Sequence, residues 1–374
     1  MKIQRFGQVA ALALVGSIAL AGCGSDNNTG TGASGSSSAS ASTAGDCFEG
    51  TLNAEGSSAQ KNAFEEAAAS FGDLCGGKAT VNYNPTGSGA GIKQFIAGQV
   101  DFAGSDSALK TVEKDGVIEA DAAATYCGSP AWNIPMVTGP IAISYNVKGV
   151  DKLVLTPAVA ADIFKGTITT WNDPKIAAVN PGATLPATPV KVFFRSDESG
   201  TTENFTKYLK AAAADVWTDE PGKKWTGKGE GKEKSAGVAE GVKSTDGGIT
   251  YVEWSYAKDN DLGIAQVDNG GGAVELTSES VGKAVEAAKA DGEGNDLRLK
   301  LDYATKEAGA YPILLVTYEI VCSKNKDAEK AKQIKAFLTH FASTEVQSGL
   351  EKIGYAPLPA SVQTKVEAAI GALS

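Results

Sequence analysis

The fold of this chain is decided by residues 79–106, which read ATVNYNPTGSGAGIKQFIAGQVDFAGSD. A strand-like pattern over 79–83 leads into a glycine- and serine-rich turn, a segment with apolar residues at helical spacing, and a short apolar run over 100–103. Upstream, residues 50–54 are strand-like, and 59–71 carry an apolar helical face. This alternation predicts an α/β fold built on a parallel, doubly wound sheet.

Hydroxyl-rich segments follow three of the predicted strands and lead into predicted helices. They contain Ser57 and Ser58, then Ser88, and then the run from Arg195 to Thr201, which follows a strand-like stretch over 190–194. A helix N-terminus offers unpaired N–H groups and partial positive charge, and hydroxyls add further donors. Because such junctions meet at one edge of a parallel sheet, we expect a cage for a small tetrahedral oxyanion.

Two long apolar runs, 133–144 and 311–321, divide the rest of the chain. We expect two lobes joined by these crossing strands, with the second lobe inserted into the first. Lobe one comprises 46–140 plus 312–374, and lobe two comprises 141–311. The lysine-rich run 221–235 is interpreted as a solvated loop.

The N-terminus is typical of an exported protein. Residues 1–22 have a basic start and a short apolar core, and Leu20-Ala21-Gly22-Cys23 resembles the lipobox of bacterial lipoproteins. That resemblance implies a lipidated Cys23; the alternative is an ordinary secretory signal with a chance cysteine. Residues 23–45, rich in glycine and serine, predict a flexible tether.

Composition excludes several function classes. The 374-residue chain has a formal net charge of −10, which argues against nucleic-acid binding and requires any anion site to act locally. It has no P-loop and no GxSxG elbow, and His340 is its only histidine. We therefore expect no enzyme, no metal site and no cofactor, and we interpret His340 as a structural or surface histidine.

Each candidate site residue also has an ordinary interpretation. Asp106 could be a turn or N-cap aspartate, and Arg195 with Asp197 could form a local surface ion pair. The serines and Thr201 could simply cap helices. The recurrence of such ends with glycine favours the anion site.

Several motifs carry a family resemblance across the whole mature domain. They are GSGAGIKQF (87–95), VDFAGSD (100–106), IFKGTITTWNDP (163–174), Arg195 to Thr201, GGITYVE (247–253) and GYAPLP (354–359). With them the chain resembles the PstS family of phosphate-binding lipoproteins of bacterial phosphate ABC transporters. The resemblance implies a two-lobed, type II periplasmic-binding-protein fold, with one doubly wound mixed sheet per lobe and a hinge of two crossing strands.

The same resemblance implies the site and the partners. The phosphate-binding residues would be Ser57, Ser58, Ser88, Asp106, Arg195, Ser199, Gly200 and Thr201, with Asp197 pairing with Arg195. The family often has Thr-Phe where this chain has Ser57-Ser58, so backbone contacts of that loop carry over better than side-chain contacts. The chain would be a monomer, lipid-anchored at the outer face of the cytoplasmic membrane, delivering phosphate to an ABC permease and its ATPase.

Ligand chemistry separates this function from its rivals. Phosphate carries a proton at neutral pH, whereas sulfate only accepts hydrogen bonds, so a buried Asp106 carboxylate favours phosphate. Rival functions are a receptor for sulfate or molybdate, a phosphate-binding hydrolase, and a surface sensor or adhesin.

Four cysteines remain after Cys23, an even number in an exported chain. Three pairings are possible. Cys47 and Cys75 each precede a predicted parallel strand, while Cys127 precedes the first crossing run and Cys322 follows the second. We therefore predict the disulfides Cys47–Cys75 and Cys127–Cys322.

Overall fold

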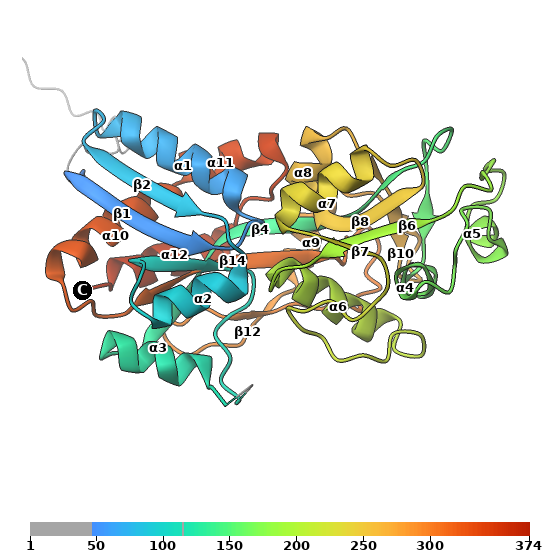
Figure 1. The fold of residues 1–374 in the computed structure, drawn as a ribbon. Helices are drawn as coiled ribbons and strands as arrows, with labels where there is room; N and C mark the ends of the chain where they lie inside the picture. Colours follow the sequence, from blue (N-terminus) through green and yellow to red (C-terminus); the bar gives the residue numbers. More distant parts are fainter. Residues whose placement is uncertain (1–46, 114–115) are drawn as a thin grey trace, which may run out of the picture. The chain divides into compact units, whose positions relative to one another are not determined.

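One mixed sheet runs through the part of the chain that the computed structural model describes, residues 47–113 and 116–374 (Figure 1). Within these residues nine strands join it, in the order β2-β1-β3-β14-β4-β8-β6-β7, with β9 also paired to β4. Their bounds are β1 Gly50–Gly56, β2 Ala79–Asn84, β3 Phe102–Ser105, β4 Ala131–Asn146, β6 Lys191–Arg195, β7 Glu230–Lys232, β8 Gly248–Glu253, β9 Gly263–Ile264 and β14 Leu314–Cys322.

The N-terminal end of the sheet confirms the predicted strand–helix alternation. Strand β1 lies between β2 and β3 and is parallel to both. Helix α1 (Lys61–Leu74) buries Phe64 and Phe71 against Phe337 of α10 (Ala328–Phe341). Helix α2 (Ser88–Ile96) packs Ile92 and Phe95 into a separate small cluster with α3 (Glu119–Cys127). The apolar spacing read from the sequence therefore marks the faces that the helices bury.

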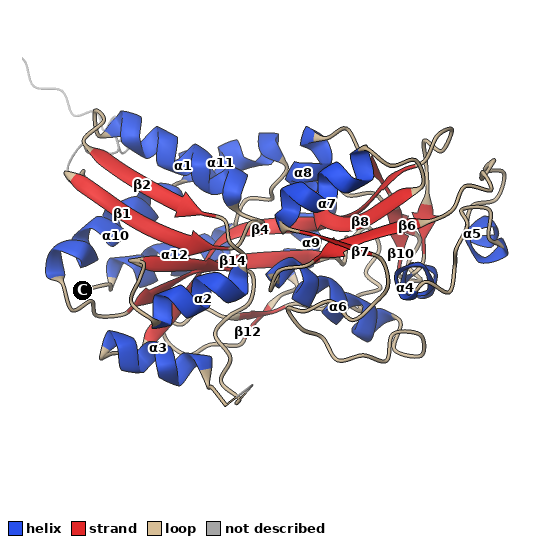
Figure 2. Ribbon diagram, in the orientation of Figure 1, coloured by secondary structure: helices blue, strands red, loops and turns tan. Residues whose placement is uncertain are grey.

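The long strand β4 joins the two ends of the sheet. Its first part, up to Pro140, pairs with β14, and its last part, from Ile141, pairs with β8. The two crossing runs expected from the sequence are therefore neighbouring antiparallel strands. Because both ends share β4, the strands form one continuous sheet, where the sequence analysis expects one sheet per lobe (Figure 2).

The other end of the sheet has its own aromatic core. Strand β6 is parallel to β7 and β8, and α6 (Gly200–Ala212) stacks Phe205 on Tyr251 at 4.6 Å between ring centroids. Phe164 and Trp225 complete this cluster. The helices of this part are α4 Pro157–Lys165, α5 Pro174–Val179, α7 Lys234–Lys243, α8 Trp254–Asp259 and α9 Ser278–Glu286.

Short elements complete the described chain. Small sheets form from β5 (Val154–Leu155), β10 (Gln266–Asp268) and β11 (Ala273–Val274), and from β12 (Lys289–Ala290) and β13 (Leu299–Lys300). The C-terminal helices are α11 (Thr344–Leu350), the 3-10 turn η1 (Glu351–Ile353) and α12 (Ala360–Gly371). No helix in residues 47–113 and 116–374 is long and apolar enough to cross a membrane.

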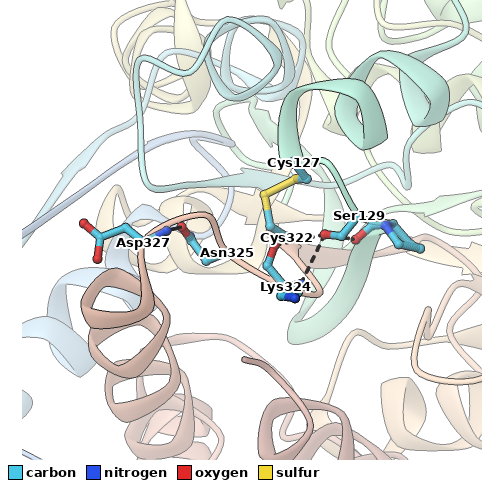
Figure 3. The surroundings of a disulfide bond; sticks show 7 residues. Cys127, Ser129, Cys322, Lys324, Asn325 and Asp327 are labelled. Carbon is cyan, nitrogen blue, oxygen red and sulfur yellow. Dashed lines mark hydrogen bonds between the residues drawn. A yellow bond between two sulfur atoms is a disulfide. The ribbon is translucent and has the colours of Figure 1, made fainter.

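Two disulfides, with the predicted pairing, cross-link elements at the end of the sheet that contains β1, β2 and β3. Cys47 is bonded to Cys75, which follows α1. Cys127 at the end of α3 is bonded to Cys322 at the end of β14, across 195 residues of sequence (Figure 3). Beside this second bond, the Ser129 hydroxyl donates to the Lys324 carbonyl at 3.0 Å.

The solvated-loop interpretation of residues 221–235 is wrong in part. Lys223 is buried and forms an ion pair with Glu119, with 3.3 Å between the charged atoms. Residues 230–232 form the edge strand β7, and Ser235 is fully buried at the start of α7. The density of charged residues in the sequence does not predict this burial and pairing. The tertiary fold supplies an acidic partner for Lys223 and a strand edge for residues 230–232.

Candidate anion-binding site

The site is built where three parallel strands end. Ser57 and Ser58 directly follow β1, Ser88 begins α2 after β2, and Asp106 directly follows β3. The Ser57 amide donates to the Gly104 carbonyl at 2.8 Å, which ties the first loop to the third strand. Gly87 caps α2 with φ of +104°, and a Cβ on it would lie 2.6 Å from Asp197 Oδ2. Glycine is required there because the chain turns sharply against a carboxylate.

Asp106 is the centre of the first group of residues. Its carboxylate accepts hydrogen bonds from the Ser57 hydroxyl at 2.5 Å, the Ser88 hydroxyl at 3.0 Å and the Thr317 hydroxyl at 2.7 Å. The carboxylate is buried, with 3% of the residue exposed. Burial raises the pKa of Asp106 to about 6, although the hydroxyls of Ser57, Thr317 and Ser88 oppose the rise. At pH 7 the group is mostly ionised and accepts hydrogen bonds.

Arg195 is the centre of the second group. It ends β6, is 2% exposed, and donates through Nε to Asp197 Oδ1 at 2.7 Å and through Nη2 to Asp197 Oδ2. Burial alone would lower the pKa of the Arg195 guanidinium, but Asp197 outweighs burial and raises it. The same pair holds the pKa of Asp197 below its usual value, against the effect of burial. The predicted Arg195–Asp197 pair is therefore formed, and it is partly buried rather than a surface pair.

The N-terminus of α6 brings the two groups together. Ser199 caps the helix by accepting from the Thr202 amide at 3.1 Å, and Gly200 is the first helical residue. A Cβ on Gly200 would lie 2.6 Å from both Asp106 Cβ and Ser88 Oγ. Only glycine lets this positive helix end approach the carboxylate so closely.

Further contacts close the cluster. Ser58 Oγ and Ser235 Oγ are 2.8 Å apart, and Arg195 Nη1 donates to Ser235 Oγ at 3.1 Å. The Asn204 amide group, on α6, donates to the Asp106 carbonyl at 2.7 Å. The structure thus gathers in one buried cluster all the residues that the sequence analysis singles out: Ser57, Ser58, Ser88, Asp106, Arg195, Ser199, Gly200 and Thr201, with Asp197 beside them.

Four buried residues of the cluster are absent from the sequence-based set. Thr317 lies in the middle of β14, Asn204 in α6, Ser235 near the start of α7, and Glu253 at the end of β8. Glu253 accepts a hydrogen bond from the Thr201 hydroxyl through Oε1. A polar residue inside an apolar strand, such as Thr317 within 311–321, is the one signal that could have pointed to this set.

The cluster has the chemistry of an oxyanion site. It offers hydroxyl donors, one arginine and helix N-termini, together with one central acceptor, Asp106. In the described residues no group of three or more His, Cys, Asp and Glu is arranged to hold a metal ion.

The chain is similar to several known proteins. Residues 36–345 match the PBP superfamily domain. The phosphate-binding protein PstS2 of Mycobacterium bovis is 43% identical over 379 residues, and PstS 3 of Mycobacterium tuberculosis is 44% identical over 380, each covering both chains fully. PstS of Xylella fastidiosa is 34% identical over 298 residues, covering 77% of this chain and 76% of that one.

Solved structures share the fold. A periplasmic phosphate-binding protein, PfluDING, bound with phosphate superposes with a TM-score of 0.66 at 22% identity, covering 85% of this chain and 93% of that one. A putative phosphate transporter substrate-binding protein from Clostridium perfringens gives 0.58 at 19%, covering 83% and 100%.

The matched domain and the named relatives define the class: a binding protein of the PBP superfamily. The chain belongs to the PstS family of phosphate-binding proteins.

Proposed function

We propose that this chain is a receptor that binds inorganic phosphate outside the cytoplasm and delivers it, as a monomer, to an ABC permease and its ATPase. The observation that carries the proposal is the buried Asp106 carboxylate, facing a helix N-terminus among hydroxyl donors. Family membership supports it, since relatives identical at 43–44% over their full length are phosphate-binding proteins by name.

The ligand would be held by groups from both halves of the sheet. Ser57, Ser58 and Ser88 would donate from one side, and Arg195 with the α6 N-terminus, at Ser199, Gly200 and Thr201, from the other. Asp197 would hold Arg195 in place through its paired hydrogen bonds. The Ser57 and Ser88 hydroxyls, which donate to Asp106 in the structure, would turn to the phosphate oxygens.

Asp106 would provide the selectivity. Phosphate near neutral pH carries at least one proton and can donate to the carboxylate, whereas sulfate cannot. A site built around one hydrogen bond can reject an analogue that lacks it by up to ~10⁴–10⁵-fold. A receptor for sulfate or molybdate is therefore the weaker candidate.

Binding would close two lobes, 46–140 plus 312–374 and 141–311. Separate hydrophobic cores support this division. One core lies within 141–311 apart from five members, Ala59, Ile313, Leu314, Leu315 and Ala356, and the buried members of the other lie before 138 and after 320. The strand order supports the type II arrangement of the proposed fold, because β14 lies between β3 and β4. The segments near Pro140 and Pro312 would be the hinge.

A lipid on Cys23 would anchor the receptor to the outer face of the cytoplasmic membrane. Cys23 and the tether to residue 45 lie outside the described residues, and the support is the lipobox-like sequence. Intact-mass analysis of the native protein should find a lipidated Cys23; an unmodified cysteine would refute the anchor.

Titration calorimetry with phosphate, arsenate and sulfate tests the function. We expect a phosphate Kd of about 1 μM or tighter, about −8 kcal/mol, with arsenate close to phosphate and sulfate far weaker. Sulfate binding as tight as phosphate binding, or no phosphate binding, would overturn the proposal.

A further inference from the structure

Behind the site lies a second buried carboxyl group, Glu319, which the proposed function does not use. It is fully buried in β14, two residues after Thr317, so both side chains project to the same face of the sheet. Thr317 donates to Asp106 on this face. Both carboxyl oxygens of Glu319 lack a hydrogen-bond partner among the described residues.

The sheet register shows what Glu319 faces. Its partners across the sheet are Gly104 on β3 and the apolar Ile134 on β4. A Cβ on Gly104 would lie 2.1 Å from Gln60 Nε2 and 2.5 Å from the Tyr83 hydroxyl. Gln60 and Tyr83 therefore fill the space above Gly104, the residue that pairs with Glu319 across the sheet.

A chain of hydrogen bonds leads from Gln60 to the anion site. Gln60 Nε2 donates to the Tyr83 hydroxyl at 3.0 Å, and that hydroxyl donates to the Ser57 carbonyl at 2.7 Å. Gln60 Oε1 is buried and has no donor among the described residues. Both Glu319 oxygens and Gln60 Oε1 are thus buried acceptors without a donor in the described chain, on two side chains that adjoin Gly104. A neutral Glu319 would supply a proton to Gln60 Oε1.

We propose that Glu319 is a positioning residue of the phosphate site. Its neutral carboxyl donates to Gln60 Oε1 and thereby sets the direction of the hydrogen bonds that run from Glu319 through Gln60 and Tyr83 to Ser57. Loss of this proton weakens phosphate binding. An ionised Glu319 would need a donor, so the Gln60 amide would turn its Nε2 toward the carboxylate. The Tyr83 hydroxyl would then donate to Gln60 Oε1 and release the Ser57 carbonyl. The inference rests on the proposed function.

The electrostatic surroundings support a neutral Glu319. Burial raises its pKa to about 8, against a lowering by Gln60 and with a further rise from the Asp106 carboxylate. Tyr83 on β2 and Asp106 after β3 are the titratable groups in electrostatic contact with it, and no cation of the described chain acts on its pKa. Burial, with Glu319 as the next cause, keeps the pKa of Tyr83 well above its usual value, so Tyr83 remains a donor. A bound phosphate anion would raise the pKa of Glu319 further, so binding above pH 8 would draw a proton from solvent onto its carboxylate.

The test is calorimetric titration of the full chain with phosphate at several pH values between 6.5 and 9.5. Each titration is repeated in two buffers of different ionisation enthalpy, which measures proton uptake. Wild type is compared with Glu319→Gln, which cannot ionise, and with Glu66→Gln, a control at an exposed position of α1. Above pH 8, the phosphate affinity of wild type should fall, relative to that of Glu319→Gln, by about tenfold per pH unit. On binding phosphate there, wild type should also take up as much as one proton more than Glu319→Gln does. Glu66→Gln should follow wild type.

Parallel pH profiles and equal proton uptake in wild type and Glu319→Gln would overturn this inference alone. Absence of phosphate binding by wild type at every pH would overturn the proposed function and this inference with it. If Glu319→Gln does not fold, carbon-13 NMR of wild-type glutamate carboxyls decides. A carboxyl that titrates near pH 8, and higher with phosphate, supports the proposal; titration of all glutamates below pH 6 contradicts it.

Discussion

At the scale of single residues, one arginine supplies the only full positive charge found in the described site cluster. Arg195 is buried, and its guanidinium is oriented by Asp197 through two hydrogen bonds. It also contacts Ser235 and, through the Thr201 hydroxyl, the segment that begins α6. In the proposed site, Arg195 would therefore present its charge to the anion in a fixed geometry, which would let an acidic protein bind an anion.

Arg195→Ala should weaken phosphate and arsenate binding together, by roughly 30-fold or more, the usual cost of removing one partner of a buried charge pair. Both ligands lose the same charge, while the Asp106 acceptor is unchanged. Calorimetry with each anion measures the effect. Asp197→Asn, which keeps Arg195, serves as the matched control and should weaken binding less. A loss for phosphate but not for arsenate would contradict this role.

Glu319 gives a pH dependence of stability with a definite sign. Its pKa is about 8 in the folded chain against an ordinary value of 4.5, so the folded state binds the proton more tightly. Stability relative to Glu319→Gln is therefore greatest below about pH 4.5, falls by at most about 1.4 kcal/mol per pH unit up to about pH 8, and is level above it. Urea unfolding of both proteins without phosphate, from pH 5 to 9, measures this difference; a difference that stays constant with pH would contradict it.

At the scale of elements, the sequence predicts what is local and misses what is brought together by folding. The strands and helices around 79–106 are readable because their apolar residues repeat at period two or at helical spacing. Ser57 and Asp106 are readable because each directly follows a strand of one parallel sheet, and Ser88 because it begins the helix after the neighbouring strand. Thr317 and Ser235 are not, because their place in the site depends on the register of β14 and on the packing of α7.

The same limit applies to the sheet as a whole. The sequence predicts two crossing runs. It does not predict that β4 pairs with β14 along its first part and with β8 along its last part, which makes one continuous sheet. Burial of Lys223 likewise depends on Glu119, far away in sequence.

The two disulfides should differ in their effect on stability. Cys127–Cys322 closes a segment of 195 residues and Cys47–Cys75 one of 28. In the loop-entropy account, a longer closed loop restricts the unfolded chain more, so replacing Cys127 and Cys322 by alanine should cost roughly 1–2 kcal/mol more than replacing Cys47 and Cys75. Guanidinium unfolding of the two double variants tests the difference. Equal losses would show that native-state effects dominate.

At the scale of the whole molecule, the proposed function requires movement of two lobes about the shared strands β4 and β14. The separate hydrophobic cores can move as rigid bodies because each is packed within itself. Small-angle scattering should show a smaller radius of gyration with saturating phosphate than without it, and no change with sulfate at the same concentration. A radius of gyration that phosphate leaves unchanged would contradict lobe closure.

The central claim is that Asp106 makes the site selective for a protonated oxyanion, and one measurement tests it most directly. The ratio of phosphate to sulfate affinity should be measured by calorimetry at pH 7 for wild type and Asp106→Asn. An asparagine amide can donate as well as accept, so sulfate no longer meets an acceptor-only group. We predict that sulfate discrimination falls by at least tenfold while phosphate affinity falls only modestly, because the other donors remain. An unchanged ratio in Asp106→Asn would show that Asp106 is a structural turn residue and that selectivity arises elsewhere.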